Sequence, residues 1–152
     1  MLNLILPASY AKEIDQNRLG LALRETLRHQ NINEEASVTL RLTNNRLIRQ
    51  YNLAWLGVDA ATDVLSFENA YTDPESGEHY LGDILISFEK ARRQARLGNH
   101  SLQDEIEMLF VHGLLHIAGH DHDKKETWER MNLAQDAILE KIGNPLRGSI
   151  QY

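Results

Sequence analysis

The sequence has 152 residues and no cysteine, and its 16 basic and 22 acidic side chains give a net charge of −6. Without cysteine the chain has no disulfide, no thiolate nucleophile and no thiolate metal ligand, which leaves histidine and carboxylate as the strong ligands. The acidic balance argues against a broad basic surface for nucleic acid, so any such contact should be local.

We expect one domain over residues 1–152, because the chain shows no repeat, no low-complexity tract and no shift in composition. A chain of this length buries about two-thirds of its unfolded surface. The apolar start, Met1–Leu6, has no basic residue before it and is too short for a signal peptide core. Charged residues interrupt every candidate membrane span of roughly 18 to 20 residues. We therefore predict a soluble, cytoplasmic protein without a membrane partner.

The first half of the chain alternates strands and helices. Met1–Leu6 is predicted to be a strand, residues 10–29 carry leucines at helical spacing, and residues 38–42 alternate apolar and polar side chains as a half-buried strand does. Asn44 is a predicted cap for a helix that ends near Gly57. The apolar stripe of that helix consists of Leu47, Ile48, Tyr51, Ala54 and Trp55.

The second half begins with a predicted hairpin of residues 62–69 and 80–87, whose connection is rich in turn-forming residues. Three helices follow, with start signals at Ser87, Ser101 and Asp123. The first ends at Gly98 and the last at Gly143. We predict an α+β fold in which a mixed four-stranded sheet packs with about five helices, and a metal site lies at the end of a central buried helix.

The metal prediction comes from four histidines within residues 112–122. His112 and His116 are four residues apart on an apolar helix, so their side chains share one face and could bind one ion at about 2.0 Å. Buried imidazoles at this spacing are costly unless something satisfies their nitrogens. If the helix continued, His120 would lie roughly 12 Å along the axis from His112, too far to share the ion.

Gly119 resolves the distance, because a glycine just past the last turn can end the helix and turn the chain back. His120 or His122 could then supply a third ligand, and spacing does not choose between them. Three histidines leave one tetrahedral position for water, as in catalytic zinc sites. Gly113 occupies the position where zinc proteases of the H-E-x-x-H type have their glutamate base, and we expect it to permit close helix packing.

The stretch His112–His122 reads H-G-L-L-H-I-A-G-H-D-H and resembles the signature of the YbeY family of metal-dependent endoribonucleases. The segments 62–67 (TDVLSF) and 81–84 (LGDI) are also similar to that family, and the likeness extends over about residues 36–142. The resemblance implies one zinc ion per chain, held by His112, His116 and His122. It also implies cleavage of single-stranded RNA, maturation of the 3′ end of 16S rRNA, ribosome quality control, and ribosomal RNA and particles as partners, with no DNA.

Two positions depart from the family pattern. His120 stands where the family usually has tyrosine, and Leu56 stands where it commonly has an arginine suited to a phosphate. Leu56 implies slower cleavage. The other basic side chains that could contact phosphate are on two predicted helices: Arg46, Arg49, Lys90, Arg92, Arg93 and Arg96.

The predicted chemistry is hydrolysis of a phosphodiester by water whose pKa the metal lowers to about 7. The sequence identifies no catalytic acid or base. Asp121 is suited to orienting a histidine, and Asp83 and Ser66 are weaker candidates. A zinc peptidase and a non-catalytic ribosome-assembly factor with a structural metal are the alternatives. The missing glutamate speaks against the first, and Leu56 favours the second.

Overall fold

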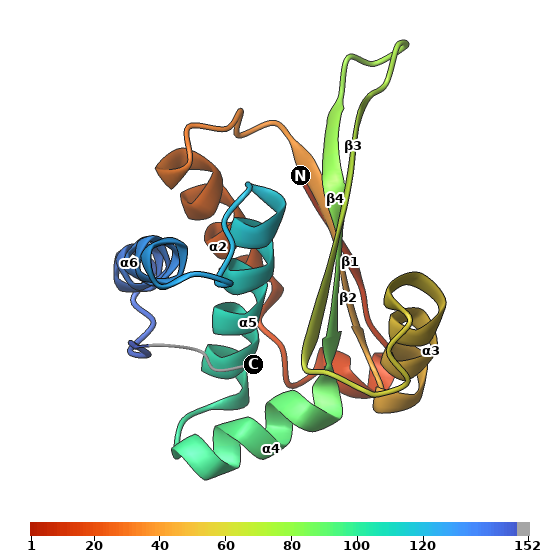
Figure 1. Ribbon diagram of the computed structural model, residues 1–152, viewed down its shortest axis with the longest axis vertical. Coiled ribbons are helices and arrows are strands. Elements are labelled where there is room, and N and C mark those ends of the chain that lie inside the picture. The colour runs from red at the N-terminus through yellow and green to blue at the C-terminus, as the bar shows by residue number, and fades with distance from the viewer. Residues whose placement is uncertain (149–152) are drawn as a thin grey trace.

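The computed structural model describes residues 1–148, in which four strands form one mixed sheet. The strands are β1 (Leu2–Ile5), β2 (Ser37–Thr43), β3 (Val64–Thr72) and β4 (His79–Ser87), and their spatial order is β1-β2-β4-β3. β1 and β4 both run parallel to β2, whereas β3 and β4 form an antiparallel hairpin. β3 is therefore an edge strand, and the hairpin extends beyond the rest of the molecule (Figure 1).

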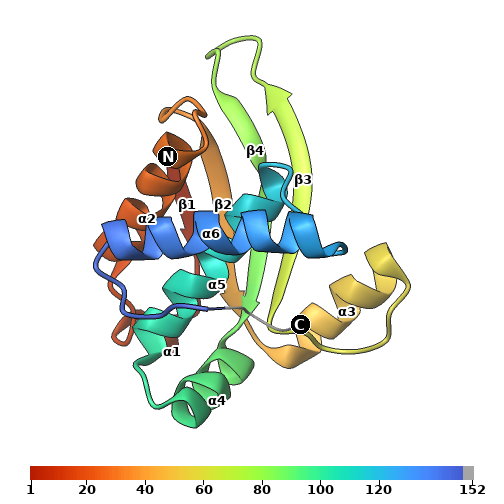
Figure 2. The same ribbon diagram turned by 60° about the vertical axis from the view of Figure 1, so that its left-hand side comes forward.

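Helices lie on both faces of the sheet. α2 (Gln16–His29), α5 (Leu102–Ile117) and α6 (Lys125–Lys141) lie on one face, which we call the inner face, and α6 crosses α5 there (Figures 1 and 2). α3 (Asn45–Leu56) lies on the opposite, outer face, and α4 (Phe88–Gly98) follows β4 at one end of the sheet. The one-turn helix α1 (Ala8–Ala11) comes directly after β1.

The predicted α+β fold with its four-stranded mixed sheet and buried central helix is confirmed. The caps agree at three helices, since Asn44, Ser87 and Ser101 each accept a hydrogen bond from a backbone N–H three residues later. Two helix starts differ. The first long helix begins at Gln16, where the Asp15 side chain caps it, and the last begins at Lys125 rather than at Asp123. Residues 149–152 of the expected 1–152 domain lie outside the described residues.

The main core lies between the inner face of the sheet and α5. Val38, Leu40, Leu42, Ile84 and Ile86 point inward from β2 and β4 and are fully or almost fully buried. α5 is buried from Glu105 to Leu115 except at the half-buried Met108, which explains why its apolar residues show no one-sided pattern. In the described part of the chain, no helix has the length and apolar character that crossing a membrane requires.

At Gly113, α5 approaches the sheet closely. A Cβ atom built at this position would lie 2.9 Å from Ser66 Oγ and 3.0 Å from Ile84 Cγ2. Ser66 Oγ also donates a hydrogen bond to the Gly113 carbonyl oxygen, at 3.3 Å. Close packing therefore accounts for this glycine, as the sequence predicted.

Candidate metal centre

The C-terminal half of α5 carries His112 and His116 toward one end of the inner face. They are one helical turn apart, and their ring centroids are 4.8 Å apart. α5 ends at Ile117, after which Gly119 adopts φ 102° and the His120 N–H donates to the Leu115 carbonyl oxygen at 2.9 Å. This turn is the chain reversal predicted at Gly119.

The reversal brings His122 back to the two helical histidines. Its ring centroid lies 5.8 Å from that of His112 and 5.0 Å from that of His116. One nitrogen from each of the three rings lies within 4.8 Å of the other two. Tetrahedral zinc with bonds of about 2.0 Å needs donor atoms roughly 3.3 Å apart, so only a small closure separates this arrangement from a bound one.

His120 lies outside this group. Its Nε2 atom is 2.8 Å from Gln30 Oε1, on the loop after α2. The structure therefore gathers His112, His116 and His122, and it directs the remaining histidine of the segment to a structural contact.

The three histidines differ in burial. His112 is only 5% exposed, His116 is half-buried and His122 is exposed. Desolvation lowers the pKa of His112 to about 3, with a further contribution from the neighbouring His116, and desolvation also lowers the pKa of His116. Both imidazoles are therefore neutral at physiological pH, which is the protonation state that binds a metal.

Gln135 on α6 determines which nitrogen of His112 is available. His112 Nδ1 lies 3.0 Å from Gln135 Oε1, and an amide oxygen only accepts, so Nδ1 carries the proton and Nε2 keeps its lone pair. Gln135 is itself buried. No pattern in the sequence predicts this contact, because Gln135 lies 23 residues from His112 within an ordinary amphipathic helix.

The loop that carries His122 is held by Asp121. Asp121 Oδ1 accepts a hydrogen bond from the His122 backbone N–H at 2.7 Å, so Asp121 orients the backbone of the third histidine rather than its ring.

Asp63 has a comparable role at the start of β3, where it accepts from the Val64 backbone N–H at 2.8 Å and from Gln94. Burial raises the pKa of the Asp63 carboxyl.

A pocket of about 390 Å³ opens in front of the histidines. Thr62, Val64, Ser66 and Glu68 of the β3 segment form one wall, and Leu56 at the end of α3 contributes to the rim. Position 56 thus faces the metal centre, although its present side chain offers no charge. Glu68 brings a carboxylate into the lining, a feature that the sequence did not reveal because its strand register was unknown.

Several expected contributors lie elsewhere. Asp83 is on the outer face of the sheet, where its carboxylate accepts from the Tyr80 hydroxyl, so it does not line the histidine pocket. Arg49 pairs with Asp59, and Arg92 pairs with Glu13. None of the six basic residues considered on α3 and α4 lines the pocket in the described chain.

The fold and these side chains define an α+β domain with a three-histidine site suited to a metal ion. The family model described as Endoribonuclease YbeY matches residues 8–143. Endoribonuclease YbeY of Thermus thermophilus is 41% identical over 122 residues, which are 80% of this chain and 87% of that protein. Endoribonuclease YbeY of Moorella thermoacetica is 45% identical over 117 residues, or 72% of this chain and 74% of that one.

A solution structure of a Thermotoga maritima protein matches with a TM-score of 0.58 at 24% identity, over 95% of this chain and 94% of that one, and supports the fold. The family match and the two relatives lead to a plain conclusion. This chain belongs to the Endoribonuclease YbeY family.

Proposed function

We propose that this protein is a zinc-dependent endoribonuclease, specific for single strands, that acts in 3′-end maturation of 16S rRNA and in ribosome quality control. His112, His116 and His122 would hold one zinc ion. The observation that carries the proposal is the convergence of three imidazole nitrogens within 4.8 Å, at the wall of an open pocket, in a chain of this family.

The donor set fits zinc. Three histidine imidazoles without a thiolate match the ligands of catalytic zinc sites, in which a fourth position stays open. When bound there, zinc lowers the pKa of water to about 7 and polarises a phosphoryl oxygen. The open pocket would provide room for a phosphodiester beside the three histidines.

The protein's own side chains then have separate tasks. Gln135 fixes the tautomer of His112, and Asp121 fixes the loop of His122. Glu68, in the pocket lining, is the candidate for holding or moving a proton during cleavage. Leu56 offers no cation at the rim, so this position does not stabilise charge that develops on phosphoryl oxygens away from the metal.

The test is the initial rate of cleavage of an unstructured oligoribonucleotide by zinc-loaded protein, with and without a chelator, beside the His116→Ala variant. We expect cleavage that the chelator and the substitution both abolish, and no cleavage of a perfect duplex. Equal rates for wild type and His116→Ala would reveal a contaminating nuclease. Turnover of casein would instead indicate a peptidase. Binding of ribosomal particles with RNA left intact would indicate the assembly factor, the alternative that Leu56 favours.

A further inference from the structure

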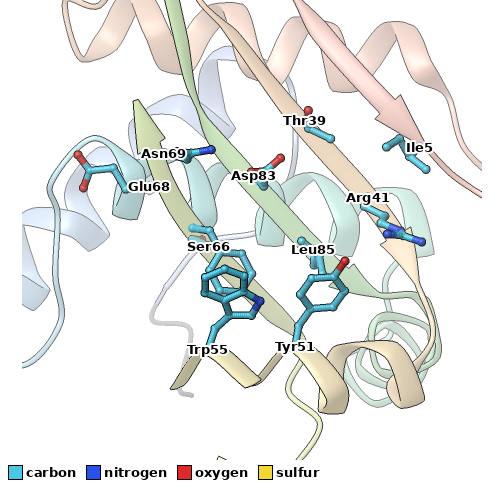
Figure 3. A pocket seen from close by; sticks show the side chains of 11 residues that line it. Ile5, Thr39, Arg41, Tyr51, Trp55, Ser66, Glu68, Asn69, Asp83 and Leu85 are labelled. Atoms are coloured by element: carbon cyan, nitrogen blue, oxygen red, sulfur yellow. The ribbon is translucent and has the colours of Figure 1, made fainter. Parts of the chain in front are cut away.

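A second cavity lies on the outer face of the sheet, opposite the histidines. This outer groove has a volume of about 590 Å³, within the range of small-ligand sites, and lies between α3 and the exposed part of the sheet (Figure 3). Trp55 and Tyr51 enter it from α3, Arg41 from β2 and Asp83 from β4. None of these four residues has a part in the metal centre.

Of the aromatic side chains that line the groove, Trp55 is open to solvent, whereas Tyr51 and Phe67 are half-buried. Trp55 is 70% exposed, and the rings of Trp55 and Tyr51 are tilted against Phe67 with centroid separations of 6.3 and 6.4 Å. Phe67 therefore packs against both rings, and the Trp55 side chain remains largely accessible. Exposed rings beside polar groups are a feature of proteins that stack single-stranded bases.

Arg41 supplies a cation to the same groove. It is half-buried on a central strand, yet within residues 1–148 its guanidinium has no ion pair or hydrogen bond. Within the described residues, the other two half-buried arginines both have an acidic partner, Arg18 with Glu107 and Arg92 with Glu13. An unpaired guanidinium in a groove is suited to an anion, and its fork matches a phosphate.

The outer groove and the histidine pocket share part of their lining at β3. Ser66 and Glu68 line both cavities, because β3 is the edge strand that separates them. Trp55 lines the groove, and the adjacent Leu56 lines the histidine pocket. One extended strand can therefore pass over the edge of β3 and occupy both cavities.

We propose that the outer groove is a nucleotide subsite for the RNA strand whose phosphodiester lies at the histidines. Bases stack on Trp55 and Tyr51, and a phosphate pairs with Arg41. The Asp83 carboxylate accepts a hydrogen bond from an exocyclic amino group of a base, and the Asn69 amide donates to a base edge. The groove thus supplies locally the RNA contact that the chain's overall negative charge does not provide. This inference rests on the proposed function.

The experiment measures binding of a fluorescently labelled 12-nucleotide RNA by anisotropy, with chelator present so that no turnover occurs. The variants are Trp55→Ala and Arg41→Gln. Their matched controls are Leu133→Ala, an exposed apolar residue on α6, and Arg24→Gln, an exposed arginine on α2. Trp55→Phe retains a ring and Arg41→Lys retains a charge.

The two variants have different expected signatures. Trp55→Ala should weaken binding about fivefold to a hundredfold without changing the salt dependence, since stacking is lost and no charge is removed. Arg41→Gln should also weaken binding, and the slope of log Kd against log salt should fall in magnitude by about 0.7, the value for one phosphate contact on a single strand. Trp55→Phe and Arg41→Lys should recover most of the affinity, and both controls should bind as wild type does.

Cleavage kinetics separate this inference from the proposed function. On the 12-nucleotide substrate, zinc-loaded Trp55→Ala should show a raised KM with kcat preserved, and on a dinucleotide it should match wild type. If wild type cleaves RNA while both variants bind and cleave as the controls do, the subsite is refuted, and the groove is left for a protein partner. If wild type does not cleave but the variants lose RNA binding as described, the subsite stands and the proposed function fails.

Discussion

The inner face of the sheet packs against α5 with side chains that are almost fully buried, whereas α3 covers only part of the outer face. On the inner face, burial keeps His112 neutral and Gln135 fixes its orientation, so the histidines are prepared for a metal. On the outer face, the Trp55 ring is exposed, and Arg41, which has no ion pair within residues 1–148, lines the groove. If both proposals hold, the inner face supplies the metal chemistry and the outer face contributes to binding RNA.

The largest effect is expected when a histidine of the metal centre is replaced. His122→Ala should abolish retention of zinc, because His122 completes the group of three nitrogens, whereas His120→Ala should retain most of it, because His120 contacts Gln30. The measurement is zinc content by mass spectrometry after dialysis. The reverse pattern would mean that the loop rearranges so that His120 binds the metal in place of His122.

Leu56 lies at the boundary between the two faces, and Leu56→Arg tests whether a cation there assists cleavage. A guanidinium at this rim position should raise the cleavage rate, since one preorganised donor at a developing charge is worth about a hundredfold to a thousandfold. Because Leu56 is 60% exposed, we expect a gain of at most about a hundredfold. The comparison uses initial rates on an unstructured oligoribonucleotide, with Leu53→Arg on the same helix as the control. A rate no higher than wild type would show that other groups already provide this stabilisation.

Gln135→Leu tests whether the inner face depends on a buried hydrogen bond. Without the acceptor for Nδ1, His112 loses its fixed tautomer and orientation, and zinc affinity should fall about tenfold to a hundredfold. Competition with a chromophoric chelator measures the affinity. Gln30→Leu, which removes the partner of His120 instead, is the matched control. An unchanged zinc affinity in Gln135→Leu would show that packing alone orients the His112 ring.

Two helical glycines test the packing of the inner face. Gly113→Ala gains helix propensity of about 1 kcal/mol, but its Cβ would overlap Ser66 and Ile84, so we expect a net loss of about 1 to 2 kcal/mol. Gly20→Ala on α2 meets no atom within 4 Å and should gain about 1 kcal/mol. Urea denaturation measures both. Equal changes in the free energy of unfolding for the two variants would contradict the close approach at Gly113. The approach would also be contradicted if adding Ser66→Ala to Gly113→Ala did not reduce the loss of stability.

Local patterns in the sequence predicted much of this arrangement. Helix caps at Asn44, Ser87 and Ser101 depend on contacts within three residues, and the turn at Gly119 depends on one glycine, so both could be read before the structure was known. The family signature selected His122 where helical geometry left His120 open. The structure then brings His122 to the other two histidines.

Features that depend on distant contacts could not be predicted in this way. Gln135 approaches His112 only because α6 crosses α5, and Glu68 enters the pocket only because of the register of β3. Trp55 belongs to an apolar stripe that predicts burial, yet α3 overhangs an open groove and leaves the ring exposed. Asp83 looked like a candidate near the site in sequence, but strand alternation directs it to the opposite face.

Stoichiometric zinc titration of the metal-free protein tests the central claim most directly, with RNA cleavage and bound zinc measured in the same samples. If the three histidines form the metal centre, the cleavage rate will rise linearly and level off at one zinc per chain, and His116→Ala will neither bind zinc nor cleave at any point. Cleavage by the metal-free protein, a break far from one equivalent, or a His116→Ala titration that follows wild type would contradict the account.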